Sequence, residues 1–332
     1  MSANLLDVPD LAMTNILNYL DYPAIRNVRK SCKALRRFID TARIGALPDY
    51  IMLTDLHETV YLQAVFKSDT SLRISVFYKK EGDGCRIKYI NEKDKEEKEE
   101  KVTVLENQDY LESFSTDCKL LLANEKIVLD ELEIMANENS MLKIIEDILK
   151  TRNQMIQIKK IYITVADDTE VANLVQYTNP NHLERLRIQI NDNISELPEI
   201  EKLPHWRHVE EFQIFSVLSE VHPQKFSHFT KCHLRCKSVD TETVKALQEI
   251  FYQTTNYKME FHLSTDTSIH ENVFFDLLGH VELFRNADYQ HQWFFRIKNS
   301  SEMVLHVAID RTRCRFRFSE KSRIPNGFEV IG

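Results

Sequence analysis

The sequence is short of glycine, with six in 332 residues. Loops that hold phosphate groups, such as the P-loop and the dinucleotide-binding turn, need closely spaced glycines, and neither motif occurs. The six cysteines follow no disulfide-framework spacing, and the first ten residues, MSANLLDVPD, do not resemble a signal peptide. We therefore expect reduced thiols and a cytoplasmic and/or nuclear protein.

Long apolar runs and an excess of basic residues are also missing. No stretch approaches the roughly 18 consecutive apolar residues that a membrane span requires, so we expect no membrane partner. The formal net charge of −8 argues against nucleic acid as a partner, because phosphate binding normally requires a basic excess. No nucleophile elbow, kinase signature or metalloprotease helix occurs, so we expect no catalytic residue and no cofactor. The enzymatic alternative, a hydrolase, would need a pocket in which several titratable groups converge.

The sequence does have a segment dense in apolar residues at its N-terminal end, residues 8–40. The spacing of its apolar residues predicts three short amphipathic helices, with a turn at residues 21–23. A domain of this size needs disulfides, a metal or a partner surface for stability. We expect these helices to bury their surplus apolar side chains against something else. That surface is either a partner protein or the domain that follows in this chain.

The spacing within this segment resembles an F-box. Its characteristic positions are held by Val8-Pro9, Ile16-Leu17, Leu20, Ile25, Val28, Cys32-Lys33 and Phe38-Ile39. Three positions depart from the family pattern, with Val8 for Leu, Ser31 for Val and Leu35 for Trp. The resemblance implies docking to a Skp-type adaptor, which connects indirectly to a cullin complex and a ubiquitin-conjugating enzyme. It assigns adaptor contact to Pro9, Leu11, Ile16, Leu17, Leu20, Ile25, Val28, Cys32, Leu35, Phe38 and Ile39.

Residues 46–125 are expected to form an antiparallel β-rich connecting region. Alternating apolar residues predict strands at 60–66, 72–80, 86–91 and 102–105, and the sequence EGDG at 81–84 predicts a hairpin turn. The tract EKDKEEKEEK at 92–101 carries charges of both signs. We interpret it as a solvated loop between two strands, the alternative being a nuclear-localisation or acidic contact tract.

Residues 126–332 are expected to form a strand–helix array. A short strand pattern recurs every 20–29 residues, a period typical of leucine-rich repeats. It reads LDELEIM, IKKIYIT, LERLRIQ, VEEFQIF, FTKCHLR and YKMEFHL. Helices are expected between them, for example at 141–152, 170–176 and 241–252. The asparagine ladder of typical repeats is missing, so the array is degenerate.

This array also resembles the FTH domain that follows the F-box in the nematode F-box A group. The resemblance covers residues 129–318 and rests on LPHWRHVEEFQI, FSHF and VDTETVKALQEIF, in that order. Together the two resemblances predict an α+β / α/β fold. Its parts are an F-box at residues 1–45, the β-rich region and a leucine-rich-repeat-like FTH domain with some antiparallel strands, which would bind a target.

Two further clusters bear on binding. Residues 303–318 are expected to form one strand on which Arg311, Arg313, Arg315 and Arg317 share a face. These arginines are our candidate for binding an acidic or phosphorylated target, the alternative being a solvated edge strand. His228, Cys232, His233 and Cys236 lie close together, but a strand would put both thiols on the core face and His233 on the other. We therefore expect no metal site.

These observations favour a substrate-recognition subunit of a Skp–cullin–F-box ubiquitin ligase, which is not itself an enzyme. It would hold the Skp-type adaptor through the F-box and present a protein target whose identity the sequence does not reveal. The alternative is a non-degradative interaction scaffold or decoy that keeps adaptor binding without ligase function.

Overall fold

The computed structural model describes residues 7–20, 22–42, 47–67, 71–93, 97–137, 139–191, 194, 196–270, 272–279 and 290–332. The chain divides into two compact units. Unit 1 comprises Met1–Ile163 and Asn173–His182, and unit 2 comprises Thr164–Ala172 and Leu183–Gly332. Helices at the N-terminal end precede a strand-rich region, which confirms the predicted mixed fold class. No helix in the described ranges is long and apolar enough to span a membrane.

The N-terminal segment forms the three predicted helices, α1 (Asp10–Asn18), α2 (Tyr22–Ser31) and α3 (Lys33–Ala42). Helix α1 follows Pro9, whose carbonyl accepts a hydrogen bond from the Met13 N–H at 2.9 Å. Helix α2 has Arg29 and Lys30 in its last turn, where cations interact favourably with the helix dipole.

Unit 1 contains a sheet with the strand order β7-β6-β1-β2-β3-β4-β5. Strands β1 to β5 pair antiparallel in succession, and β1 pairs parallel to β6. The predicted boundary between residues 125 and 126 therefore falls within one sheet. The strands are β1 (Tyr50–Asp55), β2 (Thr59–Lys67), β3 (Ser71–Glu81), β4 (Gly84–Lys93), β5 (Glu97–Leu105), β6 (Val128–Met135) and β7 (Gln157–Val165).

The charged tract at 92–101 is more ordered than a solvated loop. Residues 92–93 belong to β4 and residues 97–101 to β5, and the two strands pair, so the loop interpretation is wrong for them. Residues 94–96 lie outside the described ranges. Cross-strand ion pairs such as Lys88–Glu100 at 2.7 Å explain how so polar a sequence holds a strand. The predicted turn at 81–84 is confirmed, with Gly82 at φ +58°.

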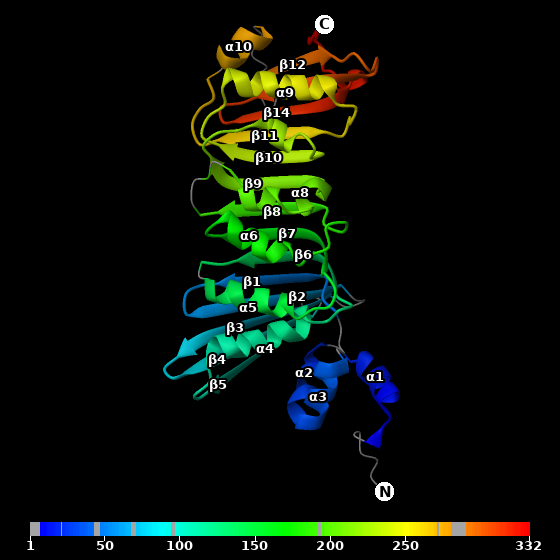
Figure 1. Cartoon of the computed structure of the whole chain (residues 1–332), viewed down its shortest axis with the longest axis vertical. Helices are drawn as coiled ribbons and strands as arrows, with labels where there is room; N and C mark the ends of the chain where they lie inside the picture. The colour runs from blue at the N-terminus through cyan, green and yellow to red at the C-terminus, as the bar shows by residue number, and fades with distance from the viewer. Residues whose placement is uncertain are drawn as a thin grey trace. The chain divides into compact units, whose positions relative to one another are not determined.

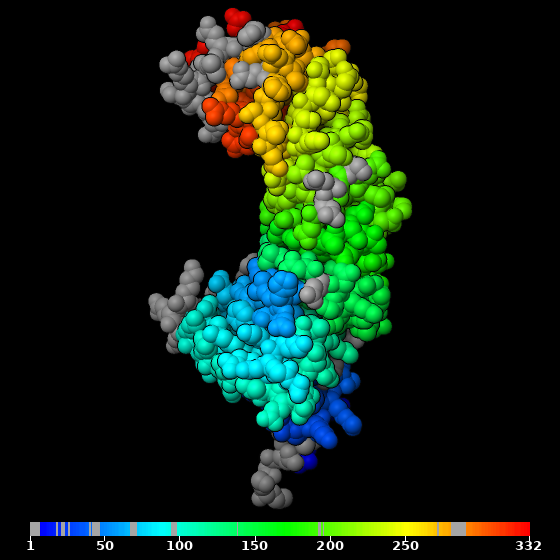
Figure 2. Space-filling model, turned by 90° about the vertical axis from the view of Figure 1, so that its left-hand side faces the viewer, coloured from blue at the N-terminus to red at the C-terminus, as the bar shows by residue number. Residues whose placement is uncertain are grey.

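Helix α4 (Tyr110–Leu122) covers strands β2 to β4, and the sequence analysis missed it. The Asp109 carboxylate caps the start of the helix by accepting hydrogen bonds from the N–H groups of Leu111 and Glu112, at 2.8 and 3.1 Å. Phe114 is fully buried, with its ring edge-on to Tyr78 at 5.8 Å. The Tyr78 hydroxyl donates to Asp117 at 2.6 Å. Figure 1 shows α4 and α5 (Asn139–Lys150) lying along the same face of these strands, and the two helices contact each other. In Figure 2 this region is coloured cyan to green.

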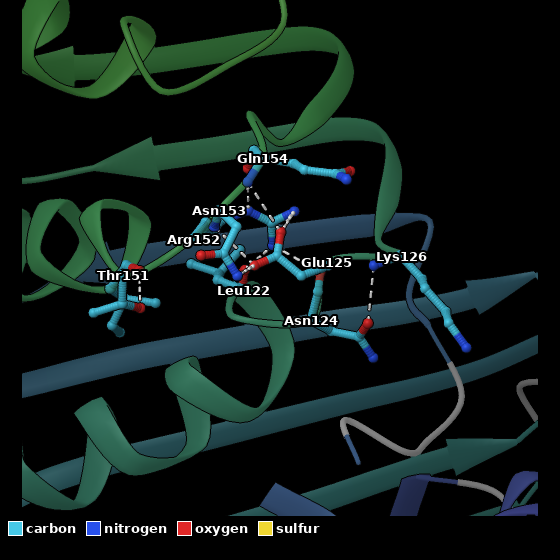
Figure 3. A network of polar contacts seen from close by, with 9 residues as sticks. Leu122, Asn124, Glu125, Lys126, Thr151, Arg152, Asn153 and Gln154 are labelled. Atoms are coloured by element: carbon cyan, nitrogen blue, oxygen red, sulfur yellow. Dashed lines mark hydrogen bonds and ion pairs between the residues drawn. The ribbon is translucent and has the colours of Figure 1, made fainter. Parts of the chain in front are cut away.

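A buried arginine connects two loops of unit 1. The Arg152 side chain, 2% exposed, follows α5 and reaches back to the loop after α4 (Figure 3). Its Nη1 donates to the carbonyls of Leu122 and Asn124, and its Nη2 lies 3.6 Å from Glu125. These contacts fix the turn that leads into β6.

Unit 2 contains a sheet with the strand order β15-β12-β13-β14-β11-β10-β9-β8. The repeat strands β8, β9, β10 and β11 pair parallel, and β14 pairs antiparallel to both β11 and β13. The elements are α6 (Asp168–Val175, shared with unit 1), β8 (Arg185–Ile190), α7 (Pro198–Glu201), α8 (His205–His208), β9 (Glu211–Leu218), η2 (Pro223–Phe226), β10 (Lys231–Cys236), α9 (Thr241–Gln253), β11 (Glu260–Thr265), α10 (Asn272–Leu278), β12 (His291–Arg296), β13 (Met303–Ile309), β14 (Arg313–Glu320), η3 (Lys321–Arg323) and β15 (Val330–Ile331).

The predicted single strand at 303–318 is wrong, because it is a hairpin of β13 and β14. The Asp310 carboxylate accepts hydrogen bonds from the N–H groups of Thr312 and Arg313, at 2.8 and 2.7 Å, and so closes a turn without glycine or proline. Arg311 lies in that turn, off the strands. The edge-strand alternative is also wrong, because β14 has a neighbour on both sides.

Period-two alternation gives strands β8 to β11 and β14 one apolar and one polar face, whereas β13 is buried on both faces. The apolar face packs against helices: Phe251 of α9 contacts Phe316 and Phe318 of β14, and Trp206 of α8 contacts Phe212 of β9. The polar residues of the same strands, such as Arg315 between Cys314 and Phe316, therefore lie on the face away from these helices.

Candidate functional site

Helices α1 to α3 share a small core of their own. Its buried members are Met13, Leu17, Ile25, Leu35 and Ile39. Val8, Leu20, Val28, Cys32 and Phe38 pack against it and stay partly exposed. As far as the structure describes it, every member of this core belongs to residues 8–39, so the helices satisfy one another better than their length suggests.

Helix α1 has apolar residues on its exposed side as well as its buried side. Met13 and Leu17 point into the shared core, whereas Leu11, Ile16 and Tyr19 are 76%, 45% and 92% exposed. At about 100° per residue, Leu11 and Tyr19 lie about 140° from the direction of Met13 and Leu17, and Ile16 lies on the flank, about 80° from it. We call these three residues, of which Tyr19 directly follows the helix, the outer face of α1. Exposed apolar patches are typical of protein-binding surfaces.

The adaptor-contact residues inferred from the sequence fall into three groups. Pro9, Leu11 and Ile16 are exposed, while Leu20, Val28, Cys32 and Phe38 are partly buried. Leu17, Ile25, Leu35 and Ile39 are buried in the core of the helices. Adaptor contact remains a prediction for all of them, and the buried four also hold the helices together. Tyr19 is a candidate that sequence reasoning missed, although its spacing from Leu11 and Ile16 places it on their side.

A second candidate surface is a groove of about 290 Å³ on the polar face of unit 2. It lies across β8 to β11, and two rows of laterally paired residues line it. The outer row is Arg185, Glu211, Lys231 and Glu260. The central row is Arg187, Gln213, His233 and His262, and Arg315 of β14 continues this row.

Both carboxylates of the groove are held in ion pairs. Glu211 accepts hydrogen bonds from Arg185 and from Lys231. Burial alone would raise the pKa of Glu211, but these two hydrogen bonds hold it below its ordinary value. Glu260 accepts from His262 and forms an ion pair with Arg315 at 2.5 Å. The hydrogen bond from His262, together with the charge of Arg315, outweighs burial and lowers the pKa of Glu260 to about 2.

The central histidine of the groove is uncharged at neutral pH. Burial, and then the neighbouring His262, lower the pKa of His233 below its ordinary value. The Gln213 amide donates to His233 Nδ1 at 3.2 Å, which leaves the ring proton on Nε2. His233 therefore offers a hydrogen-bond donor to the groove rather than a charge.

The arginines predicted from the sequence are divided between different partners. Arg313 forms an ion pair with Asp310 at 2.6 Å, and Arg317 donates through Nε to His306 Nδ1 at 3.1 Å. Arg311 is exposed in the turn. Arg315 continues the central row and Arg317, opposite Glu260, continues the outer row. Because the three strand arginines have different partners, they do not act as one cluster.

Two family models match the chain. The F-box domain model matches residues 5–46, and the FTH domain model matches residues 139–277. The chain is an F-box protein with an FTH domain. No curated protein and no solved structure is significantly similar to the chain.

The matches assign the two candidate surfaces to different domains. The F-box covers α1 to α3, so the chain carries a docking module for Skp-type adaptors of ubiquitin ligases. The FTH domain runs from α5 to α10 and includes strands β8 to β11 of the groove. Strand β14 lies beyond the matched residues, so the groove and its Arg315 extension combine FTH-domain strands with one later strand.

The four residues His228, Cys232, His233 and Cys236 do not point to one common site. Cys232 and Cys236 are buried on the apolar face of β10, while His233 faces the groove. Burial raises the pKa of the Cys232 thiol well above its ordinary value, which disfavours the thiolate that nucleophiles and metal ligands require. His228 hydrogen-bonds the Trp206 carbonyl at 2.6 Å. In the described ranges, no cluster of three or more His, Cys, Asp or Glu residues could hold a metal ion.

Proposed function

We propose that this chain is the target-recognition subunit of a Skp–cullin–F-box ubiquitin ligase. The F-box would hold a Skp-type adaptor through the outer face of α1, and the FTH domain would hold a protein target. The observation that carries the proposal is a helix with Met13 and Leu17 packed into a shared core and with exposed apolar residues in its outer face, within a matched F-box.

The energetics of α1 are consistent with docking. Each fully buried aliphatic or aromatic side chain contributes about 1.5–3 kcal/mol, and association itself costs about 4–15 kcal/mol. The three residues of the outer face therefore cannot supply the whole affinity. The partly exposed residues of the core, Leu20, Val28 and Phe38, would add to the contact area.

The proposed role is non-catalytic. A receptor of this kind brings a target lysine close to a loaded conjugating enzyme, and proximity alone raises the rate of transfer. The buried cysteines fit this role, because burial raises the pKa of Cys118, Cys232 and Cys314 and keeps these thiols protonated. We place the protein in the cytoplasm and/or nucleus, where such ligases act.

The test is the dissociation constant of a recombinant Skp-type adaptor for the full chain. The double variant Leu11→Asp/Ile16→Asp should weaken binding at least about 100-fold, because two buried apolar contacts are lost and two charges must be desolvated. Val102→Asp is the matched control, since Val102 is 49% exposed on β5, outside the F-box. Unchanged binding by the double variant would refute the proposed docking face.

Adaptor binding without target degradation would instead favour the scaffold or decoy function. The half-life of a captured target with and without the receptor separates the two functions. A target that turns over equally fast in both conditions would contradict the ligase role.

A further inference from the structure

We propose that the groove of unit 2 binds an extended acidic segment of a protein partner, with Arg187 and Arg315 as anchoring residues. This inference rests on the proposed function in one respect: the segment is taken to belong to the target of the ligase. Binding to the groove itself requires neither the adaptor nor ubiquitin transfer.

The first argument is the local charge. The groove with its Arg315 extension contains four cations, namely Arg185, Arg187, Lys231 and Arg315, and two carboxylates. It therefore has an excess of two positive charges in a chain whose net charge is −8. A concave surface lined by one sign of charge attracts ligands of the opposite sign.

The second argument is that two arginines have donors left over. In the described ranges Arg187 forms no ion pair, and its buried Nε has no hydrogen-bond partner. Arg315 binds Glu260 through Nη2, but its buried Nε is also without a partner. Both Nε atoms are closed to the groove, so a ligand would bind the outer guanidinium nitrogens. In the described ranges those of Arg187 have no partner, and Arg315 pairs only with Glu260. A carboxylate suits these nitrogens, because the arginine fork matches carboxylate geometry.

The third argument is distance. Arg187 on β8 and Arg315 on β14 lie at opposite ends of the central row, four strand spacings apart. At about 4.8 Å per spacing their Cα atoms are about 19 Å apart. About six residues of extended peptide span that length. A single phosphate group cannot contact both ends, so the arrangement favours a segment with several carboxylates over a single phosphorylated residue.

The residues between the anchors can complete such a site. His233 presents an Nε2–H donor, as its hydrogen bond with Gln213 requires. Phe212 and Cys232 lie beneath the polar rows and also line the groove. Neutral donors between two cations suit a peptide that alternates acidic and small side chains.

The test is fluorescence anisotropy with the full-length chain and three labelled peptides of about eight residues. One alternates Glu and Ala, one alternates Gln and Ala, and the third carries a single phosphoserine in the Gln–Ala sequence. We expect the acidic peptide to bind most tightly, and its affinity to fall with added salt because partly exposed charges are screened. Equal binding of the Glu and Gln peptides, or tighter binding of the phosphopeptide, would overturn the proposal.

Variants of the groove locate the binding. Arg187→Gln should weaken binding of the acidic peptide about tenfold, because one charge-assisted contact is lost. Arg187→Lys keeps the charge but not the fork and should give an intermediate affinity. Arg323→Gln is the matched control, since Arg323 is 73% exposed and pairs with Glu320 away from the groove. The proposal fails if both Arg187 variants bind the acidic peptide like the wild type. Adaptor binding, measured on the same samples, tests the proposed function separately, so the two failures can be told apart.

Discussion

Acidification should destabilise unit 2 through one buried histidine, His306 on β13. Its side chain is 5% exposed and stacks on Phe294 with ring centroids 4.6 Å apart. Both ring nitrogens have partners: Nε2 lies 2.9 Å from the Gln292 side-chain oxygen, and Nδ1 accepts from Arg317. The neutral ring with its proton on Nε2 satisfies both contacts. Protonation of Nδ1 would break the second contact and put a charge beside the guanidinium.

The size of the effect follows from the pKa of this histidine. Burial, and then the charges of Arg317 and Arg315, lower the pKa of His306 from 6.5 to about 4. The unfolded chain therefore takes up more protons than the folded chain between these two values. The free energy of unfolding falls as the pH drops below 6.5, and this contribution stops changing below about pH 4. At 1.36 kcal/mol per pH unit the loss is about 2 kcal/mol at pH 5 and about 3 kcal/mol at pH 4.

The assay is urea unfolding at pH 7 and pH 5, followed by tryptophan fluorescence, which reports on Trp293 of the neighbouring strand β12. We compare the wild type with His306→Gln, whose side chain cannot be protonated. Whatever its stability at pH 7, the variant should lose about 2 kcal/mol less free energy of unfolding between pH 7 and pH 5 than the wild type. Arg317→Met should also reduce this difference, since one cause of the lowered pKa is removed. An equal difference in the wild type and His306→Gln would refute the reasoning.

Two further substitutions test the packing of each unit by urea unfolding. Arg152→Met removes the donor to the carbonyls of Leu122 and Asn124 and should lower the free energy of unfolding by about 3 kcal/mol. The matched variant Arg86→Met, at an exposed ion pair, should leave it nearly unchanged, and a similar loss in both would contradict the proposed role of Arg152. Trp206→Ala removes a ring that packs edge-on against Phe212 and should lower it by about 4 kcal/mol, whereas a loss below about 1 kcal/mol would show that the aromatic cluster does not support unit 2.

Local periodicity was enough to predict most of the elements. The three N-terminal helices and the repeat strands β6 to β11 follow from apolar spacing within each segment, because one face of each element is buried. The helix expected at 241–252 is α9, where the Asp240 carboxylate accepts from the Thr243 N–H at 2.7 Å. Helix α4 was missed because its buried face includes Ser113 and Asp117, polar residues that interrupt the apolar pattern.

Features that depend on pairing between distant segments could not be predicted. The hairpin at Asp310 has no glycine or proline to mark it, so its two strands read as one. The groove depends on the register that places Arg187 in one row with His262 and Arg315, residues far apart in the sequence. Within its own strand Arg187 is one of several alternating polar residues, and nothing local distinguishes it.

Hydrogen exchange of the full chain with and without a Skp-type adaptor tests the central claim most directly. That claim is that α1 has two apolar sides, one for its own core and one for a partner. The adaptor should slow amide exchange in residues 10–19 and leave the groove strands β8 to β11 unchanged. Unchanged exchange in residues 10–19 in a saturated complex, or protection confined to the FTH domain, would contradict it.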